Sequence, residues 1–444
     1  MKYPKLMIFF ILFEMAPFAF SQETNIRALS LKEAMEIARA KSYQVLISKS
    51  QVKHARGQNL ESLSGFLPRL SISENYVRTN DPVNVFGFKL KQGVFAQPDF
   101  TLSSLNNPDA FVNFTTSFQI QQPVLNLDAV FGKSAAGLAV KARKEAARRV
   151  EETILLNVRK AYYGLILTNE NVRAFEKAVA SARSHRDNAK AAFEQGLINQ
   201  ADYLGAEVRL AELKEQLITA KHQVANANDG LKFLMGLEED NTTLVPTDSL
   251  SLPDSSFESM KQKNLSALRA DLRAIRFQTK AAARNLWMKR SSWMPRLNAF
   301  GTVEWNAADA FNKGSSSWIY GAQLQWNFFE GFAKFGRSKQ ASAKKEEAEI
   351  QFRQANEKAK MEVRQAKRAI KEAEGRLAVS KTAVKQAAES LRITEERYKQ
   401  GLEKTSDLLD KEAAYTNANV RFLKTKYDYN VAKSQLRYAL GIDE

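Results

Sequence analysis

The sequence predicts a mainly α protein with a small β part, built from two similar halves. Most of the 444 residues lie in long Ala-, Lys- and Glu-rich segments with few Gly or Pro residues, as long amphipathic helices require. Short segments in which apolar or aromatic residues alternate with polar ones occur in each half, and such period-two alternation indicates half-exposed strands. A content of 44% hydrophobic and 26% charged residues suits extended helices better than a thick globular core.

An internal repeat organises the chain. The segment GFLPRLSIS at 65–73 returns as SWMPRLNAF at 292–300, an offset of 227, whereas later segments match at an offset of 204. The first half therefore carries 227 − 204 = 23 extra residues, in a segment before Gln119 that is rich in Pro, Asn, Asp and Gly. That composition predicts a long loop.

A short turn motif recurs inside the long helical segments. QGLINQADYL at 195–204 is matched by QGLEKTSDLL at 400–409. Six residues recur at an offset of 205, namely Gln195, Gly196, Leu197, Asp202, Leu204 and Glu207, which match Gln400, Gly401, Leu402, Asp407, Leu409 and Glu412. Each copy interrupts a helical run that carries few other glycines, which predicts a tight helix reversal in each half.

The N-terminal segment predicts an exported protein. Lys2 and Lys5 precede a run of eight apolar residues, and Ala19 and Ser21 supply small residues before a cleavage site. The run is too short to span a bilayer, and no later segment approaches the ~20 apolar residues of a transmembrane helix. The chain has no cysteine, which excludes disulfides and thiolate metal sites.

The formal net charge of +17 does not by itself indicate a nucleic-acid partner. Lys and Arg are distributed among Glu residues along helical faces, as in KSAAGLAVKARKEAARRVEE, which is typical of a solvated surface. An exported protein also rarely meets nucleic acid. We therefore expect no nucleic-acid binding; that function would require a retained leader and a cytoplasmic protein.

The predicted elements follow one another in a fixed order. They are a signal peptide (1–21), an N-terminal segment with the first helix (22–65), a first strand hairpin with a long external loop (66–125), a first helical hairpin (126–236) turning at 195–203, a linker (237–261), a return helix (262–294), a second strand hairpin (295–330) and a second helical hairpin (331–444) turning at 400–410. The two longest helices would each span roughly 90 to 95 Å. Shorter helices stacked end to end would match them in length.

The strand segments have one apolar and one polar face. In NFTTSFQIQQPV, Phe114, Phe118 and Ile120 alternate with Thr, Ser and Gln residues, and YGAQLQWNFF in the second half repeats this pattern through Trp326 and Phe328. The pattern fits a membrane barrel that is apolar outside and polar inside. Four strands cannot close a barrel, because the smallest filled barrels need about eight. The chain must therefore combine with copies of itself, and three copies would give a tube of twelve strands.

The sequence gives no support for an enzyme. FGKS at 131–134 ends like a phosphate-binding loop, but its first glycine is replaced by Leu127. The second copy has Gly331 and Gly336, but Arg337 replaces the lysine, so both copies are better interpreted as structural turns. The histidines lie alone on predicted helices, at His54, His185 and His222. We expect no catalytic, cofactor or metal site.

Taken together, these segments resemble the TolC-like outer membrane efflux proteins, the outer membrane factors of tripartite efflux pumps and type I secretion systems. The resemblance covers nearly all of the mature chain and rests on FLPRL and WMPRL, NDPVNVFGFKL, LSLKEAMEIARAKS at 29–42 and the two QGL turns. It implies a homotrimer with a β-barrel in the outer membrane of a Gram-negative bacterium and a long α-helical barrel through the periplasm. Such a trimer would be a passive export channel served by a periplasmic adaptor and an inner-membrane pump, and its cargo could be drugs, metals, polysaccharide precursors or polypeptides.

The resemblance makes the two turns the periplasmic tips of the channel. An adaptor would dock at Gly196, Leu197, Gly401 and Leu402. Glycine suits both tips because a tight reversal after a helix favours a residue that is free to adopt positive φ.

The second tip carries candidate gate residues. Asp407 and Asp410 are three residues apart and share a helical face, so in a trimer they would form rings of negative charge that attract cations. The resemblance adds Tyr398 as a gate tyrosine and Asp202 as its hydrogen-bond partner. An alternative role for Asp202 and Asp407 is to cap a helix or to complement its dipole.

Two residues depart from the pattern of the family. Glu403 stands where related proteins carry an arginine latch, and Ala201 replaces a threonine partner of that latch. A carboxylate cannot donate a hydrogen bond at neutral pH. Either the tip is looser than in the family, or Lys404 takes over the role of the arginine.

A periplasmic coiled-coil scaffold or chaperone without a pore is the alternative function. Long charged helices would suit it equally well. It has no need for strands with exposed aromatic residues such as YGAQLQWNFF, so the strands favour the channel.

Overall fold

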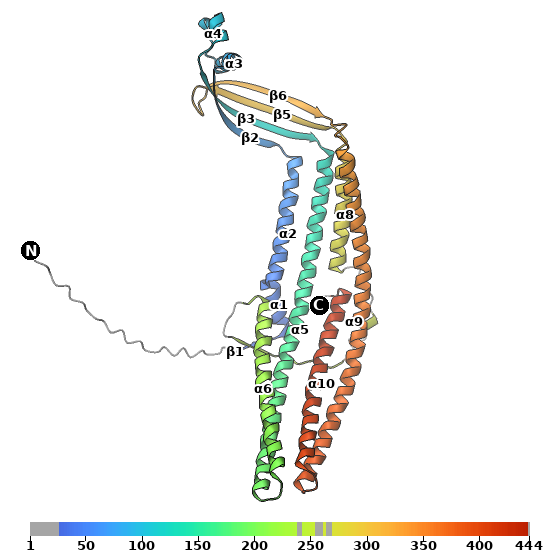
Figure 1. The fold of residues 1–444 in the computed structure, drawn as a ribbon. Helices are drawn as coiled ribbons and strands as arrows, with labels where there is room; N and C mark the ends of the chain where they lie inside the picture. Colours follow the sequence, from blue (N-terminus) through green and yellow to red (C-terminus); the bar gives the residue numbers. More distant parts are fainter. Residues whose placement is uncertain (1–25, 238–241, 254–260, 263–268, 443–444) are drawn as a thin grey trace, which may run out of the picture.

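The computed structural model describes residues 26–237, 242–253, 261–262 and 269–442. The predicted signal peptide (1–21) and part of the predicted linker (237–261) lie outside the described residues. The described part is strongly elongated, with a curved sheet at one end and two helix turns at the other (Figure 1). A mainly α fold with a small β part is confirmed.

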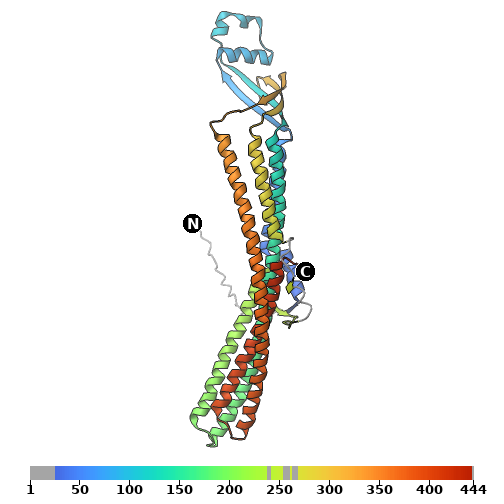
Figure 2. The same cartoon turned by 90° about the vertical axis from the view of Figure 1, so that its right-hand side faces the viewer.

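Two continuous helices set the length of the molecule. Helix α5 (Leu127–Glu194) has 68 residues and helix α9 (Ala333–Lys399) has 67, so each spans about 100 Å. Shorter helices stacked end to end lie beside them, α2 (Tyr43–Glu61) and α6 (Gln200–Met235) along α5, and α8 (Ala270–Ser291) and α10 (Thr405–Leu440) along α9 (Figures 1 and 2).

Each stack of helices has a glycine at its junction, near the middle of the molecule. Gly236 ends α6 with φ +71°, and Gly441 ends α10 with φ +72°. A Cβ on Gly236 would lie 2.2 Å from the carbonyl oxygen of Lys41, and one on Gly441 would lie 3.1 Å from the Cβ of Arg269. Both junctions therefore combine a left-handed cap with close packing against the next helix, which suits glycine alone.

We call the level of Gly236 and Gly441, near the middle of the molecule, the waist. Buried polar contacts join the elements there. Arg269 is 3% exposed and donates to the carbonyl of Ala439 at the end of α10 (3.1 Å), while it pairs with Glu362 of α9 (2.5 Å). In the other half, the hydroxyl of Tyr162 on α5 lies 2.8 Å from the carbonyl oxygen of Leu29 and 2.7 Å from Oδ2 of Asp248. Burial raises the pKa of Tyr162 to about 12, so the phenol stays neutral and available for hydrogen bonding.

The structure corrects the predicted first helix. It breaks at Ser42, whose ψ of 127° is not helical, into α1 (Leu31–Lys41) and α2. Before α1 lies a strand that the sequence analysis missed, β1 (Ile26–Leu29), which pairs in parallel with β4 (Thr243–Pro246) inside the predicted linker. Helix α8 spans Ala270–Ser291, and residues 263–268 of the predicted return helix lie outside the described residues.

The prediction of a long loop in the first strand hairpin was incomplete. This connection contains α3 (Pro82–Gln92) and α4 (Leu102–Asn106), with single 3₁₀ turns at Gln97–Phe100 and, before the hairpin, at Ser62–Gly65. Asp81 accepts a hydrogen bond from the N–H of Asn84 (2.9 Å), Pro82 starts α3, and Gly93 ends it with φ +70°. Strong signals for helix start and stop thus outweigh a loop-like composition.

Four antiparallel strands form the main sheet in the order β2 (Arg69–Thr79), β3 (Phe111–Leu125), β5 (Arg296–Ala307) and β6 (Ser315–Gln325). The register places Ile72, Phe118, Val303 and Trp318 in one row across the sheet. The adjacent row, on the opposite face, contains Ser73, Ser117, Glu304 and Ser317. One face of the sheet is therefore largely apolar and the other largely polar, as the alternation predicts.

The apolar face lies open in the single chain. Ile72 is 72% exposed, Trp318 71% and Tyr320 76%. The predicted strand through Trp326 and Phe328 ends earlier, at Gln325, but both rings remain exposed beyond it. Within the described residues, β2 and β6 each have one unpaired edge. A sheet with an exposed apolar face and two open edges requires further partners.

In the described part of the chain, no helix combines the length and the apolar character that crossing a membrane requires.

Gly236→Ala should destabilise the protein, because αL backbone costs a non-glycine residue roughly 1–2 kcal/mol and the new methyl group would meet Lys41. Thermal unfolding followed by circular dichroism checks this. Gly375→Ala in α9 is the matched control: its Cβ would meet nothing within 4 Å, so it should stabilise that helix by about 1 kcal/mol. Equal unfolding temperatures for the two variants would contradict the packing at the waist.

Candidate functional site

The two helix turns lie together at the end of the molecule opposite the sheet (Figures 1 and 2). Gly196 follows α5 with φ +73°, and Gly401 follows α9 with φ +74°. In the first turn, the N–H of Leu197 donates to the carbonyl of Ala192 (2.9 Å), and the N–H of Leu402 makes the same bond to Arg397 in the second (2.9 Å). This is the Schellman end of a helix, formed twice from the repeated QGL sequence.

The return helices begin differently at the two tips. In the first tip, the side chain of Asn199 caps α6 by accepting from the N–H of Asp202 (2.9 Å). In the second tip, Lys404 occupies the cap position and makes no side-chain cap bond. Asp202 and Asp407 are each the third residue of a first helical turn, where a carboxylate complements the helix dipole. Neither one is the N-cap residue.

Asp407 and Asp410 face away from the packed side of α10. The buried residues of its first turns are Thr405, Leu408 and Glu412. At 100° per residue, both aspartates lie roughly opposite this stripe. Asp410 is exposed and Asp407 half-buried, and within the described residues neither carboxylate has a hydrogen-bond or ion-pair partner.

The structure does not pair Tyr398 with Asp202 within one chain. The hydroxyl of Tyr398 lies 3.3 Å from Oγ1 of Thr405, in its own helical hairpin. Glu403 accepts a hydrogen bond from Nε of Arg397 (2.7 Å), in the same tip. A guanidinium and a carboxylate therefore meet at the second tip, with Arg397 as the donor rather than the residue at position 403.

A buried polar cluster joins the two helical hairpins between the tips and the middle of the molecule. His185 Nδ1 on α5 lies 2.7 Å from Oε1 of Glu412 on α10, and the hydroxyl of Ser181 donates to the same oxygen (2.9 Å). The other carboxylate oxygen, Oε2, is buried with no hydrogen-bond partner among the described residues. The prediction that His185 lies alone was therefore wrong.

The electrostatics of this cluster favour a charged imidazole. The hydrogen bond to Glu412 raises the pKa of His185 above its usual range, with help from the charge of Glu395, against the effects of burial and of Lys399. The sequence contained one signal that Glu412 has a role in the structure: the residue recurs in the repeat as Glu207. In the first tip, however, Glu207 accepts a hydrogen bond from Tyr203 (2.6 Å) instead.

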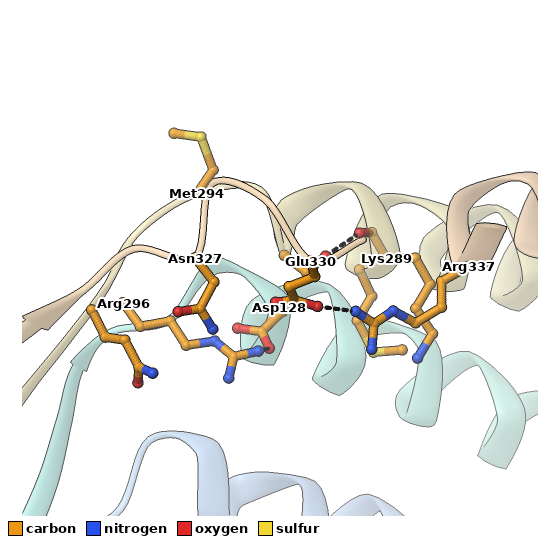
Figure 3. Close-up of a pocket in the computed structure, with 10 residues that line it drawn as sticks. Asp128, Lys289, Met294, Arg296, Asn327, Glu330 and Arg337 are labelled. Atoms are coloured by element: carbon orange, nitrogen blue, oxygen red, sulfur yellow. Dashed lines mark hydrogen bonds and ion pairs between the residues drawn. The ribbon is translucent and has the colours of Figure 1, made fainter. Parts of the chain in front are cut away.

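Ion pairs line a polar pocket of about 280 Å³ where strands give way to helices (Figure 3). Arg296 of β5 pairs with Asp128 of α5 at 2.5 Å, and Arg337 of α9 pairs with Glu330. Lys133, the lysine of FGKS, donates to the carbonyl oxygen (2.8 Å) and to Oδ1 (3.0 Å) of Asn59 near the end of α2. The interpretation of FGKS as a turn is therefore wrong, because it lies inside α5, whereas Gly331 of the second copy does lie in the turn before α9.

The part of the chain that the structure describes contains no group of three or more His, Asp or Glu side chains that could hold a metal ion.

Replacement of His185 by Gln should destabilise the protein more at low pH than at high pH. The pKa of His185 is raised in the folded state, so the stabilising ion pair is complete below the unfolded value of about 6.5 and is lost as pH rises through the folded value. Thermal unfolding of the wild-type protein and the variant from about pH 6 to 9 checks this. A pH-independent difference would contradict it, and His222→Gln, at an exposed position of α6, is the matched control.

Comparison with known proteins agrees with this architecture. The family model described as "Outer membrane efflux protein" matches residues 34–237 and 263–442. The alkaline protease secretion protein AprF of Pseudomonas aeruginosa is 22% identical over 403 residues, covering 88% of this chain and 80% of AprF. The outer membrane protein TolC of Vibrio cholerae is 22% identical over 303 residues, covering 66% of this chain and 68% of TolC.

The fold is also that of a solved channel protein. A crystal structure of CusC, described as showing folding and transmembrane channel formation, superposes with a TM-score of 0.77 at 16% identity and covers 93% of this chain and 92% of CusC. The family model spans well over half of the sequence, on both sides of the waist. The chain therefore belongs to the outer membrane efflux protein family.

Proposed function

We propose that three copies of this chain form a passive export channel whose constriction lies at the second helical tip. The protein is an outer membrane protein of a Gram-negative bacterium and extends into the periplasm. Its family and fold are those of channel proteins rather than of enzymes. The observation that carries the proposal is the four-stranded sheet, with its exposed apolar face and two open edges.

The sheet can be completed only by other copies of the chain. Strands β2 and β6 lie at opposite edges, with β3 and β5 between them, so the edges of one chain cannot reach each other. In a membrane, every backbone N–H and C=O group must be paired, which an open sheet cannot achieve. Three copies joined from β6 to β2 give twelve strands, apolar toward lipid and polar toward the lumen.

The same sheet argues against a soluble periplasmic scaffold. A scaffold would expose Trp318, Tyr320 and Leu324 to water on one contiguous face. In a membrane barrel, that face meets acyl chains and the aromatic rings meet the interface. The long helices then continue the barrel into the periplasm as a tube.

The constriction follows from the unpaired carboxylates of the second tip. Asp407 and Asp410 face away from the packed side of α10, and position 410 has no acidic counterpart in the first tip, where Gly205 occurs. In a trimer, three copies of the pair would place six carboxylates around the narrow end of the tube. Such rings attract cations and resist complete closure.

Contacts beside these aspartates would hold the closed tip. Tyr398 is tied to Thr405 within its own hairpin, which leaves Asp202 free to meet a neighbouring hairpin. Arg397 and Glu403 supply the oppositely charged pair at the position where the family carries an arginine latch. We propose that this pair replaces the latch, so neither a looser tip nor Lys404 is needed.

The exposed turns are the docking points for a partner. Leu197 is 72% exposed and Leu402 60%, each directly after its turn glycine. Exposed leucine side chains at the ends of two adjacent helical hairpins suit the docking of a periplasmic adaptor. The adaptor would connect the channel to an inner-membrane pump. The name of AprF, a protease secretion protein, favours polypeptide secretion, whereas the family description favours efflux.

Replacement of Asp407 and Asp410 together by Ala should abolish cation preference without preventing channel formation. The wild-type protein should give a small, cation-selective conductance in planar bilayers, because the carboxylate rings attract cations. Reversal potentials in a salt gradient measure the preference. Asp229→Ala, at an exposed position of α6 far from the tip, is the matched control and should leave it unchanged.

Channels whose selectivity is insensitive to the double substitution would place the constriction elsewhere. Folded, detergent-purified protein that gives no channels at all would contradict the export function itself.

A further inference from the structure

A basic hollow of about 590 Å³ lies between α5 and α8, on the side of the waist nearer to the sheet. Its charged lining consists of Lys141 from α5 and of Lys280 and Arg284 from α8. Ser134 adds a hydroxyl group, and the indole of Trp287 closes the end nearest to the sheet. The remaining lining residues are Gly, Ala and Leu, so no acidic side chain borders the hollow.

The positive charge of this hollow is not neutralised within the chain. Among the described residues, no carboxylate lies within ion-pair distance of Lys141, Lys280 or Arg284. Neighbouring arginines behave differently: Arg273 on α8 pairs with Glu145 at 2.6 Å, and Arg296 pairs with Asp128 at 2.5 Å. Three unpaired cations around one concave surface form a site for an anion.

The hollow faces the outside of the proposed tube. The pocket with Arg296 and Gln325 lies on the lumen side, because these residues share the polar face of the sheet with Gln323. Lys289 of α8 also lines that pocket. At 100° per residue, Lys280 lies roughly 180° around the helix from Lys289. Lys280, Arg284 and Trp287 therefore point outward, on the side of the apolar face of the sheet.

Neighbouring copies leave the hollow open. Helices α5 and α8 are connected to β3 and β5, the two inner strands of the sheet. Copies of the chain would meet along β2 and β6, and thus along α2 and α9, which are connected to those edge strands. The hollow lies in the middle of the surface of each protomer.

The end of the hollow with Trp287 and Arg284 lies at the depth of lipid headgroups. Exposed Phe332 and Phe335 mark the membrane boundary where α9 begins. Trp287 is four residues before the end of α8 and stacks on Phe131, which is four residues after the start of α5, with ring centroids 6.1 Å apart. Both rings are therefore only about 6 Å below the sheet. Arg284 follows at about 10 Å, Lys280 at about 17 Å and Lys141 at about 21 Å, so the hollow extends from the headgroups toward the periplasm.

We propose that this hollow binds the headgroup of an anionic phospholipid in the periplasmic leaflet of the outer membrane. The inference rests on the proposed function, which places the sheet in that membrane. The lipid phosphate would accept hydrogen bonds from Arg284, the positive charges of Lys280 and Lys141 below it would attract the headgroup, and Trp287 would lie against the glycerol and upper acyl region. Basic pockets between helices at a membrane surface bind phospholipid headgroups in this way.

Native mass spectrometry of the detergent-purified trimer, titrated with phosphatidylglycerol, tests the proposal. The wild-type protein should bind one tightly held lipid per protomer. The triple variant Lys141→Gln, Lys280→Gln, Arg284→Gln should bind at least roughly tenfold more weakly, since each cation near the membrane surface contributes about 1 kcal/mol. The triple variant Lys214→Gln, Lys381→Gln, Lys385→Gln removes the same charge from exposed positions of α6 and α9 and should bind like the wild-type protein.

The mass of the intact trimer shows in the same spectra that the variants are folded and assembled. Equal binding by both triple variants, or equal binding of phosphatidylcholine, would overturn the proposal. Competition by free glycerol phosphate at the concentration of the lipid would show a simple anion site and would overturn the assignment to lipid. A trimer that conducts ions but shows any of these results would refute the lipid site alone, whereas absence of a trimer would refute the proposed function.

Discussion

The pairing of backbone groups at the edges of the sheet is the constraint on which the rest of the structure depends. The described strands leave β2 and β6 each with an open edge, and the apolar face of the sheet is suited only to lipid. An open edge in a membrane leaves N–H and C=O groups without partners, at several kcal/mol for each group. The chain therefore becomes stable in a membrane only as part of a closed ring. The positions of the helices follow, because α2, α5, α8 and α9 each connect directly to one of the four strands.

The helices transmit this geometry over the length of the molecule. Helices α5 and α9 run without a break from the sheet to the tips, whereas their partners are divided at the waist. The glycine caps at Gly236 and Gly441 and the buried Arg269 hold these divided columns in line. Nearer the tips, the pair of His185 and Glu412 joins the two helical hairpins, as contacts of Arg149 and Thr153 with Tyr438 do nearer the waist. The tip aspartates are thus positioned by contacts made tens of ångströms from the membrane.

The sequence predicted those features that repeat with a fixed period. Long helical periodicity, period-two alternation in the strands and the duplicated QGL turns identified the fold class and both tips. It could not predict β1 and β4, because each strand has only four residues and they pair across 217 positions. It also missed the partner of His185, since Glu412 lies on another helix and its repeat counterpart Glu207 bonds a tyrosine instead. In the first strand hairpin, Asp81 and Gly93 cap α3. The sequence was nevertheless interpreted as a loop there, because its composition is typical of loops.

Disulfide crosslinking between β2 and β6 tests the central claim most directly. The chain has no cysteine, so engineered pairs are free of background. Within one chain, the two intervening strands hold β2 and β6 about 14 Å apart, too far for a disulfide. Ser71→Cys or Ser73→Cys, combined in turn with Ser317→Cys, Ile319→Cys or Gln323→Cys, samples registers on one face of the sheet. After the cysteines are oxidised in membranes that contain the protein, we expect at least one pair to give covalent trimers. Monomers alone for every pair would contradict closure of the sheet between copies.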